Sequence, residues 1–506
     1  MYNILGILMN TYKLNKLKPN ELKTIGHYTG YVCLVISILM IPPIICGIIY
    51  NDPEHLVKSF ILSAIITSIS GIILVSLFRR KQLTNLSLKG SLIFVLGIWA
   101  IIAIYSGLPY VLSGQLNPFD AFFEAMSGIT TTGFSLIPEK THPYSIAMWK
   151  ALTQWFGGLG IIVLLLVIVP SSVSLKRLFF AEGRTEQMTP NVKHTTMIFL
   201  KLYAILTVIG IVLYLILGLD LFEAICFTFT SVATGGYSIY SSDAHIFDSI
   251  AIQIVTMFLM LLGSTNFVIH YRILKGNTKD LLKDVELRAM FIIVTIATIL
   301  IMLSLYTNGY YNHDVLQIFR HSIFQVISVM SSTGFVSQDI GAWPQFSFFL
   351  LILLTFVGGS ICSTSGGIKL YNIVILFKSI WWEVEEMMLP KNTIKPKRLN
   401  HDKKEREITD KTIKTVLIFI VSYILIYLLS TFVILFYCND FATASTVAAL
   451  SIGNTGITVD YISASMPIMV KIVLIIDFWV GRISVWPLFL GVLYLINRTE
   501  SKIKSI

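Results

Sequence analysis

Charged residues are scarce in this 506-residue chain: Asp, Glu, Lys and Arg make up 13% of it, against about 25% in soluble domains. Hydrophobic residues make up 55%, and the mean hydropathy is +0.77. This composition excludes a soluble globular protein and indicates an integral membrane protein. Apolar runs near the roughly 20 residues of a bilayer-spanning helix recur along the sequence. We expect ten spans, at 27–50, 58–78, 91–112, 146–170, 195–218, 248–271, 289–307, 345–377, 414–437 and 466–496.

Several motifs are also missing. The five cysteines show no metal-ligand spacing such as CxxC, so we expect neither a metal cluster nor a disulfide framework. The N-terminus lacks the small-residue cleavage site of a signal peptide. The glycines of 358–367 do not fit a phosphate-binding loop, and "DKTIK" (410–414) only faintly resembles the phosphorylated motif of cation-pumping ATPases. We therefore expect no enzyme, no cofactor in this chain, and transport that follows an electrochemical gradient or is coupled to another ion.

The net charge of +10 is distributed unevenly. Thirty of the 38 Lys and Arg residues fall in six segments that alternating spans would place on one side of the membrane, namely 1–27, 79–89, 174–194, 271–288, 376–414 and 497–506. Cytoplasmic loops are enriched in Lys and Arg. We expect these segments and both termini in the cytoplasm, and we expect no nucleic-acid surface.

A short segment recurs four times without a gap. The copies are "FDAFFEAMSGITTTGFS" (119–135), "FEAICFTFTSVATGGYS" (222–238), "RHSIFQVISVMSSTGFV" (320–336) and "ATASTVAALSIGNTGIT" (442–458). Each has about a dozen helix-compatible residues, too few to span a bilayer, followed by a polar pentad that ends in glycine. Each copy lies between two full spans, which predicts four span–half-helix–loop–span units after two extra N-terminal spans.

The repeated polar loops favour an ion pathway. Irregular backbone at membrane depth is tolerated only where it is buried in protein or lines water. Four such loops around one axis would offer a ring of carbonyl oxygens, which replaces the hydration shell of an alkali cation. Glycine permits the φ > 0 conformations that reorient carbonyls, and the half-helices would point their negative C-terminal ends at the path. A single cluster of this kind would more often be a helix-packing surface.

Acidic residues follow the pentads at Glu139, Asp243, Asp339 and Asp460, on the expected outer face. They would form either an acidic vestibule that concentrates cations or ordinary solvated loops. Two further features lie within spans. The stretch 345–377 is too long for one straight helix across ~30 Å of hydrocarbon and is rich in Gly and Ser. Arg482 is an intramembrane charge, which usually faces a protein interior or a water path; the alternative is an ion pair with Asp477.

With these features the chain resembles the Trk-type potassium uptake proteins, specifically the TrkH branch of the TrkH/KtrB superfamily. "QWFGGLGIIVL" (154–164), "FVGGSICSTSGGIKL" (356–370) and "VGRISVWP" (480–487) are similar to signatures of that family. The two extra spans favour TrkH over the shorter KtrB proteins. The chain departs from the family after Gly-Arg, where Ile483 and Ser484 replace the usual Leu-Glu.

The resemblance implies site residues. The potassium-binding filter would comprise Ile129, Thr130, Thr131, Thr132, Gly133, Val232, Ala233, Thr234, Gly235, Gly236, Met330, Ser331, Ser332, Thr333, Gly334, Ile452, Gly453, Asn454, Thr455 and Gly456. An intramembrane gating loop would comprise Gly358, Gly359, Ser360, Ser363, Thr364, Ser365, Gly366, Gly367 and Lys369, although a Gly-rich packing surface is an alternative for the same residues. Arg482 would oppose cation passage below the filter. Three of the pentads end in a single glycine, which suggests weaker discrimination of potassium from sodium than in TVGYG channels.

The resulting expectation is an all-α polytopic membrane protein that mediates gated potassium uptake. Its units are an N-terminal two-span unit at 1–85 and pore repeats at 86–190, 191–285, 286–400 and 401–506. The resemblance further implies a homodimer, a cytoplasmic nucleotide-binding (TrkA-like) regulatory subunit and a bacterial cytoplasmic membrane. The basic segment 376–414 is a candidate docking surface for that subunit, or simply a solvated loop.

Two other classes of function remain as alternatives. A secondary potassium symporter coupled to protons or sodium is the first, although such folds often contain inverted repeats whereas these repeats run in the same sense. A membrane scaffold is the second, but it would have no need for four matched polar loops.

Overall fold

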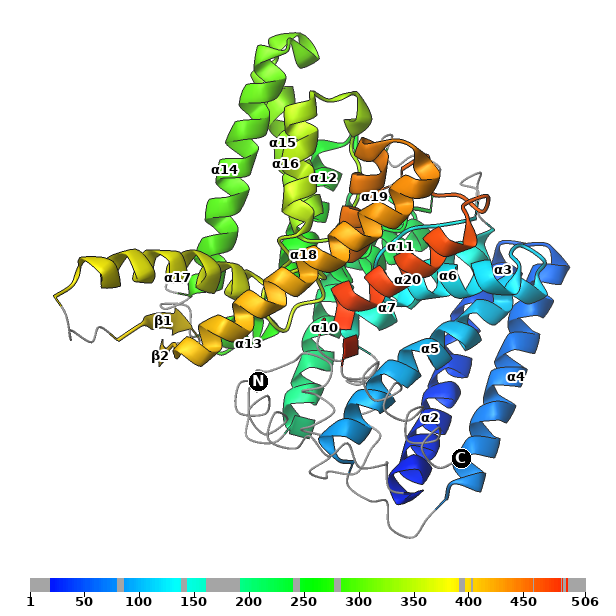
Figure 1. The fold of residues 1–506 in the computed structure, drawn as a ribbon. Coiled ribbons are helices and arrows are strands. Elements are labelled where there is room, and N and C mark those ends of the chain that lie inside the picture. The colour runs from blue at the N-terminus through cyan, green and yellow to red at the C-terminus, as the bar shows by residue number, and fades with distance from the viewer. Residues whose placement is uncertain are drawn as a thin grey trace.

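The computed structural model describes residues 19–79, 86–137, 143–160, 192–239, 246–276, 284–390, 396–401, 404–457, 459–483, 485 and 488–489. The described part is overwhelmingly helical, in agreement with the predicted all-α class (Figure 1). Its strands form one short antiparallel hairpin, β1 (Arg398–His401) and β2 (Lys404–Glu407), which the sequence analysis did not foresee.

Six helical segments of the described chain are long and apolar enough to cross a bilayer. They coincide with six of the expected spans and are α2 (Pro19–Leu39) joined to α3 (Ile41–Ile49), α4 (Glu54–Leu77), α5 (Leu88–Leu112), α10 (Val192–Ile216), α14 (Val285–Thr307) and α18 (Asp410–Cys438). At 1.5 Å per residue, the 24 residues of α4 extend about 36 Å, enough for the hydrocarbon core.

The other four expected spans are shorter or broken in the described residues. They are α7 (Tyr144–Leu159), α12 (Ile250–Ser264) with α13 (Phe267–Leu274), α16 (Gln345–Thr355) with α17 (Leu370–Met388), and α20 (Ile468–Ile483). The α12–α13 pair is bent by 105° and counts as a seventh span if it is taken as one. The break predicted within 345–377 is present, because residues 356–369 leave the helix between α16 and α17. The break in 248–271 was not predicted.

Four shorter helices precede the pentads: α6 (Pro118–Ile129), α11 (Leu221–Val232), α15 (Val315–Met330) and α19 (Phe441–Ile452). Each packs against the long helix before it, α5, α10, α14 or α18 respectively. Short 3-10 turns η2 (Tyr310–His313) and η3 (Ile340–Ala342) flank the third of them. The span–half-helix–loop–span plan is therefore present four times in the fold.

The N-terminal helices dock on the first repeat. In Figure 1 the blue helices α2, α4 and α5 stand side by side, and α2 packs against both of the others. Asp52 follows α3 and accepts hydrogen bonds from the backbone N–H groups of Tyr144 (3.1 Å) and Ser145 (2.7 Å) at the start of α7. The rings of Tyr50 and Tyr144 stack with centroids 4.1 Å apart. A carboxylate at a helix N-terminus stabilises that helix, so this contact fixes α7.

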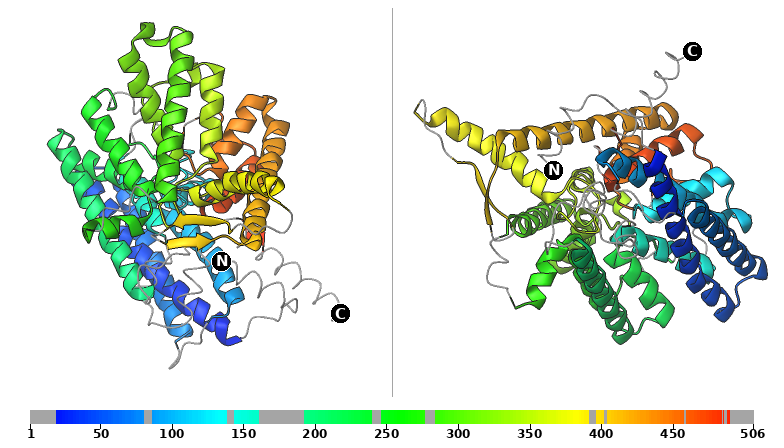
Figure 2. Two further views of the ribbon diagram at one scale, coloured as in Figure 1. Left: turned by 90° about the vertical axis from the view of Figure 1, so that its left-hand side faces the viewer. Right: turned by 90° about the horizontal axis from the view of Figure 1, so that it is seen from below.

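A lateral arm leaves the helical body after residue 369. It consists of α17, β1 and β2 and projects to one side in Figure 1, and the view from below in Figure 2 shows the same projection. Lys397 directly precedes β1, and its ammonium lies 2.8 Å from a Glu386 oxygen and 3.0 Å from an Asp410 oxygen. These contacts, above all the hydrogen bond to Glu386, raise the pKa of Lys397.

Candidate functional site

The sequence fixes where each of the four half-helices begins. Each starts after an Asn or Asp whose side-chain oxygen accepts a hydrogen bond from a backbone N–H in the first turn. These N-caps are Asn117, Asp220, Asp314 and Asp440. Asn and Asp are among the strongest N-cap residues because they satisfy N–H groups that lack a helical partner. With 12 to 16 residues, these helices extend roughly 18–24 Å, which is too short to cross ~30 Å of hydrocarbon.

The four half-helices also end alike. In the first, Thr132 N–H donates to Ser127 C=O (2.9 Å) and Thr131 N–H donates to Gly128 C=O (3.0 Å). This is the Schellman pattern, and the other three helices show the same pair of bonds. It requires a left-handed residue, which is Thr131 (φ 57°), Thr234 (φ 53°), Ser332 (φ 60°) or Asn454 (φ 52°). We call these four, the third residue of each pentad, the left-handed residues.

The left-handed residues are strained. A left-handed conformation costs an L-residue roughly 1–2 kcal/mol, and glycine usually occupies it. Threonine is an unusual choice because it is branched at Cβ. All four residues are fully buried, so the surrounding protein holds this conformation at four equivalent places. Strain that recurs in this way points to a functional backbone geometry.

The four pentads close into a ring. A Cβ atom on the last glycine of each pentad would overlap the backbone of the next pentad, and the partners are Gly235 O for Gly133, Thr333 O for Gly236, Gly456 N for Gly334 and Thr132 O for Gly456. The contacts run from repeat one to two, three, four and back to one. Four loops whose close contacts follow this closed order surround a common axis. In three of the contacts the neighbouring atom is the carbonyl oxygen of the fourth pentad residue.

Glycine serves two purposes in this ring. Gly133 (φ 91°), Gly236 (φ 72°) and Gly334 (φ 92°) have the positive φ that the sequence analysis expected of glycine. Gly456 is not among the positive-φ residues of the described chain. Its requirement is space, because a Cβ atom there would lie 2.5 Å from Thr132 O and 2.8 Å from Gly133 Cα.

Two amide side chains tie neighbouring pentads together. Gln154, on α7, donates to Gly235 O (2.7 Å) and accepts from Tyr237 N–H (3.1 Å), which joins repeat one to repeat two. Asn454 donates to Thr132 Oγ1 (2.8 Å), which joins repeat four to repeat one. Gln154 lies within the signature 154–164, but its contact with another repeat had no signal in the sequence.

The segment 356–369 lies against the ring. Its ends are held together by hydrogen bonds from Gly358 N–H to Ile368 O (2.9 Å) and from Ile368 N–H to Phe356 O (3.0 Å). Between them the chain makes an excursion that we call the gating loop, anticipating the role proposed below. Lys369 closes it and donates from Nζ to Ser365 O.

The gating loop contacts three of the four left-handed residues. Thr364 Oγ1 lies 3.1 Å from Thr234 Oγ1, and Ser365 Oγ lies 3.0 Å from Ser332 Oγ. A Cβ atom on Gly366 would lie 2.6 Å from Asn454 Oδ1, so the loop backbone also presses on the fourth pentad. The loop therefore covers one side of the ring over repeats two, three and four.

Arg482 contacts the remaining left-handed residue. Its guanidinium, on α20, donates to Thr131 Oγ1 (3.1 Å), to Gly157 O (2.6 Å) and to Gly158 O (2.9 Å). It also donates to Thr364 O of the gating loop. Loop and arginine thus cover all four quarters of the ring from the same side.

The proposed alternative partner of Arg482 has other contacts. Asp477 is fully buried and accepts from Ser430 (2.7 Å) and Ser451 (2.9 Å). Ser484, the residue that replaces the family's usual acid, lies outside the described residues.

Two of the four acidic residues expected to form the vestibule are among the described residues. Asp339 and Asp460 are described and exposed, whereas Glu139 and Asp243 lie outside the described residues. Asp339 is also a local cap that accepts from Gly341 N–H. The gathering of the four acids around one mouth stays a prediction.

Two buried ion pairs brace the first half-helix, and the sequence analysis missed both. Lys150 lies 3.5 Å from a Glu124 oxygen and donates to Ser135 (2.8 Å), which also donates to Glu124. Lys471 on α20 lies 2.5 Å from Asp120 on α6, across the seam between repeats four and one. A basic residue inside an apolar span was an available signal for each of them.

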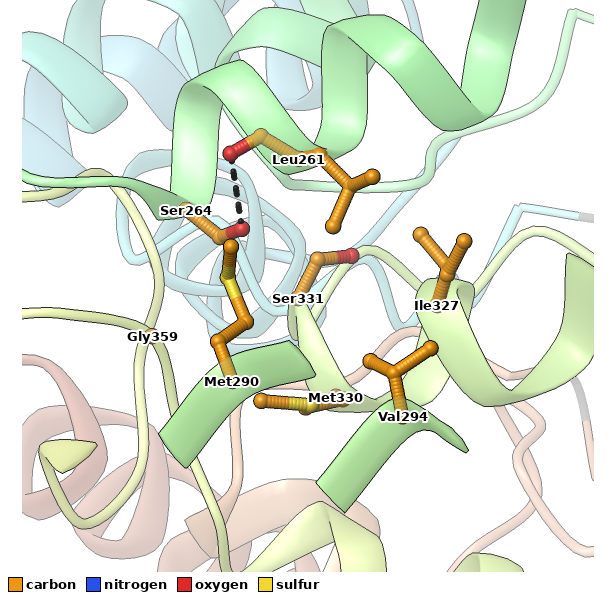
Figure 3. A pocket seen from close by; sticks show the side chains of 8 residues that line it. All are labelled: Leu261, Ser264, Met290, Val294, Ile327, Met330, Ser331 and Gly359. Atoms are coloured by element: carbon orange, nitrogen blue, oxygen red, sulfur yellow. Dashed lines mark hydrogen bonds between the residues drawn. The ribbon is translucent and has the colours of Figure 1, made fainter. Parts of the chain in front are cut away.

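A narrow cavity adjoins the third pentad (Figure 3). It is lined by Leu261 and Ser264 of α12, Met290 and Val294 of α14, Ile327 and Met330 of α15, and the following Ser331, with Gly359 of the gating loop at its edge. It is too narrow for a water molecule.

Comparison with known proteins gives consistent matches over nearly the whole chain. The family model TrkH, described as a cation transport protein, matches residues 57–499. The Trk system potassium uptake protein TrkH of Escherichia coli K12 is 31% identical over 480 residues, which cover 92% of this chain and 97% of that protein. An uncharacterised cation transporter of Methanocaldococcus jannaschii is 28% identical over 479 residues, covering 93% and 95%. The crystal structure of the potassium transporter TrkH from Vibrio parahaemolyticus matches with a TM-score of 0.81 at 25% identity, covering 92% of this chain and 98% of that one.

Proposed function

This chain belongs to the TrkH family of cation transport proteins, and from that premise we propose that it is a gated potassium uptake protein whose filter is the ring of four pentads. Relatives that match over 92% or more of the chain are named Trk system potassium uptake proteins, transporters rather than enzymes. The single observation that carries the filter assignment is the closed ring, in which each terminal glycine abuts the next pentad.

The proposed filter binds potassium through backbone oxygens. In the last turn of each half-helix, carbonyl oxygens accept the Schellman hydrogen bonds. The left-handed residue then turns the chain, so that the carbonyls after it no longer point along the helix axis. Such oxygens replace the hydration shell of the ion. The half-helix dipoles add negative potential at the same place. Potassium is then both the transported and the bound species.

The proposed gate is the gating loop together with Arg482. The loop contacts three left-handed residues and Arg482 contacts the fourth, so an ion that leaves the ring on this side meets both. A guanidinium at that position repels a cation electrostatically. Entry would be driven by the membrane potential, which contributes about 2.3 kcal/mol per charge per 100 mV when the inside is negative.

Location and partners follow as proposals. The described helices and the relatives support a multi-pass membrane transporter. We place it in a bacterial cytoplasmic membrane with both termini inside, from the distribution of Lys and Arg. A homodimer and a TrkA-like regulatory subunit are proposed from family membership, with the lateral arm as the docking surface. The units 1–85, 86–190, 191–285, 286–400 and 401–506 are proposed as its modules.

Growth rescue tests the filter. The wild type should restore growth of a potassium-uptake-deficient bacterium at low potassium, and Gly133→Val should not, because Gly133 has a φ of 91° and abuts Gly235. Gly97→Val is the matched control, since a Cβ atom at Gly97 meets nothing within 4 Å. Rescue by Gly133→Val would refute the filter assignment.

Flux into liposomes under an imposed voltage separates the two energetic modes. Potassium flux that follows voltage without a proton or sodium gradient supports a channel-like mode. Stoichiometric dependence on either gradient would instead support the symporter. The symporter is less favoured, because the four repeats run in the same sense.

A further inference from the structure

A buried carboxylate at the start of α14 accepts a hydrogen bond from the gating loop. Glu286 lies in the first turn of α14, is fully buried, and accepts a hydrogen bond from Ile361 N–H at 2.9 Å. Hydrogen bonds to an ionised acceptor are stronger than neutral ones. Ile361 lies in the middle of the gating loop, so this contact anchors the loop to the first span of its own repeat.

Cys362, the residue after Ile361, has a strained backbone conformation. Cys362 has a φ of 60°, the left-handed conformation that non-glycine residues rarely adopt. Its neighbours are fixed on the other side by bonds from Ser360 N–H to Ser264 O (2.9 Å) and from Thr364 N–H to Gly263 O (3.0 Å). The loop is therefore held between the end of α12 and Glu286, with a strained residue between the two attachments.

Apolar side chains of α14 pack near both ends of the gating loop, at Val357 and Leu370. Met290 and Val294 follow Glu286 at intervals of four residues and so lie on the same helix face. These two side chains line the narrow cavity beside Gly359 (Figure 3). The hydrogen bond from Ile361 N–H to Glu286 adds a directed contact between α14 and the loop to this apolar packing.

The start of α14 also contacts the lateral arm. Helix α14 packs against α17 and β1. Val285, next to Glu286, packs into an apolar cluster that contains Leu399 of β1 and Ile368 at the end of the gating loop. A displacement of the arm would therefore reach Glu286 through direct contacts.

We propose that Glu286 is a positioning residue for the gate: its bond to Ile361 N–H holds the strained loop beneath the ring, and a shift of the start of α14, transmitted from the lateral arm, releases it. This inference rests on the proposed gating role of the loop. Glu286 touches no ion; it acts through the loop.

Cys362 is a natural reporter of the loop position, because its side chain is only 5% exposed in this conformation. It is kept as the sole cysteine by replacing Cys33, Cys46, Cys226 and Cys438 with alanine. The rate of its modification by a small methanethiosulfonate reagent is measured in liposomes, alongside potassium flux. Glu286→Ala should raise the modification rate roughly tenfold or more, the factor expected for the loss of a hydrogen bond to a charged group, and should also raise flux.

Two further variants separate positioning from stability. Glu286→Gln keeps an acceptor oxygen without the charge, so its rates should fall between those of wild type and Glu286→Ala. Ile301→Val loosens a fully buried contact about 22 Å further along α14 and should leave the Cys362 rate unchanged. If Glu286→Ala does not reach the membrane, the test rests on Glu286→Gln, in which the modification rate of Cys362 should rise above that of the wild type.

The experiment distinguishes a failure of Glu286 as the anchor of the loop from a failure of the loop as a gate. Modification rates in the Glu286 variants equal to wild type, or equally raised in Ile301→Val, would overturn the proposal. A faster thiol reaction without any change in potassium flux would keep Glu286 as the anchor of the loop and refute the loop as a gate. A wild type that carries no potassium would refute the proposed function while the thiol rates still report on the anchor.

Discussion

Replacing Gly334 by alanine tests the ring most directly. Gly334 has a φ of 92°, and a Cβ atom there would lie 2.5 Å from Gly456 N and 2.8 Å from Gly456 C. The left-handed backbone costs an alanine roughly 1–2 kcal/mol, and overpacking against the rigid backbone adds roughly 1–3 kcal/mol. To reach ordinary contact the fourth pentad must move by roughly 1 Å, which displaces its carbonyls from the ring.

The matched control is Gly114→Ala. Gly114 also has a positive φ (74°), but a Cβ atom there meets nothing within 4 Å. Both variants carry the backbone penalty, and only Gly334→Ala carries the overlap. We expect Gly334→Ala to lower potassium flux into liposomes at least tenfold and to lower the unfolding temperature more than the control does. Equal flux in the two variants would refute the reasoning that close approach at Gly334 shapes the pathway.

Three further changes probe the surroundings of the ring. Arg482→Gln should raise cation flux, because it removes the positive charge beside Thr131; unchanged or lower flux in liposomes would count against a barrier. Gln154→Ala removes the donor to Gly235 O and should lower the potassium-to-sodium permeability ratio measured by reversal potentials. Lys471→Met leaves Asp120 as an unpaired buried charge and should destabilise the protein by about 3–5 kcal/mol in thermal unfolding, with partial recovery on adding Asp120→Asn.

The sequence predicted the register of the four pentads because the glycine alignment needs no gap. It did not predict where the backbone turns. The left-handed position falls on Thr131, Thr234, Ser332 and Asn454, and threonine in particular argues locally against such a conformation. The helix ends and the neighbouring repeats impose it, which no local pattern reports. The expectation that few carbonyls are reoriented was based on the glycines alone. It did not include these four residues, which also have positive φ.

Of the two helix breaks, the sequence predicted one and missed the other. The long Gly- and Ser-rich stretch at 356–369 predicted its own break by length and composition. The 105° bend between α12 and α13 was missed because the polar run at 263–266 is short and lies between apolar residues. A local signal existed in Asn266, which caps α13 by accepting from Val268 N–H (2.9 Å). The contacts of Glu286 and Gln154 join segments far apart in sequence, so they become visible only in the fold.

One gating loop and one arginine, joined by the bond from Arg482 to Thr364 O, cover four quarters of the ring. A pore assembled from four identical chains could not be built this way, since every element would occur four times and four such loops would compete for one axis. Placing all four quarters on one polypeptide frees each copy to diverge. The second span of repeat three carries the loop 356–369 beneath the ring, and the second span of repeat four carries Arg482. The fourfold pattern is thus kept in the pentads and abandoned directly beneath them.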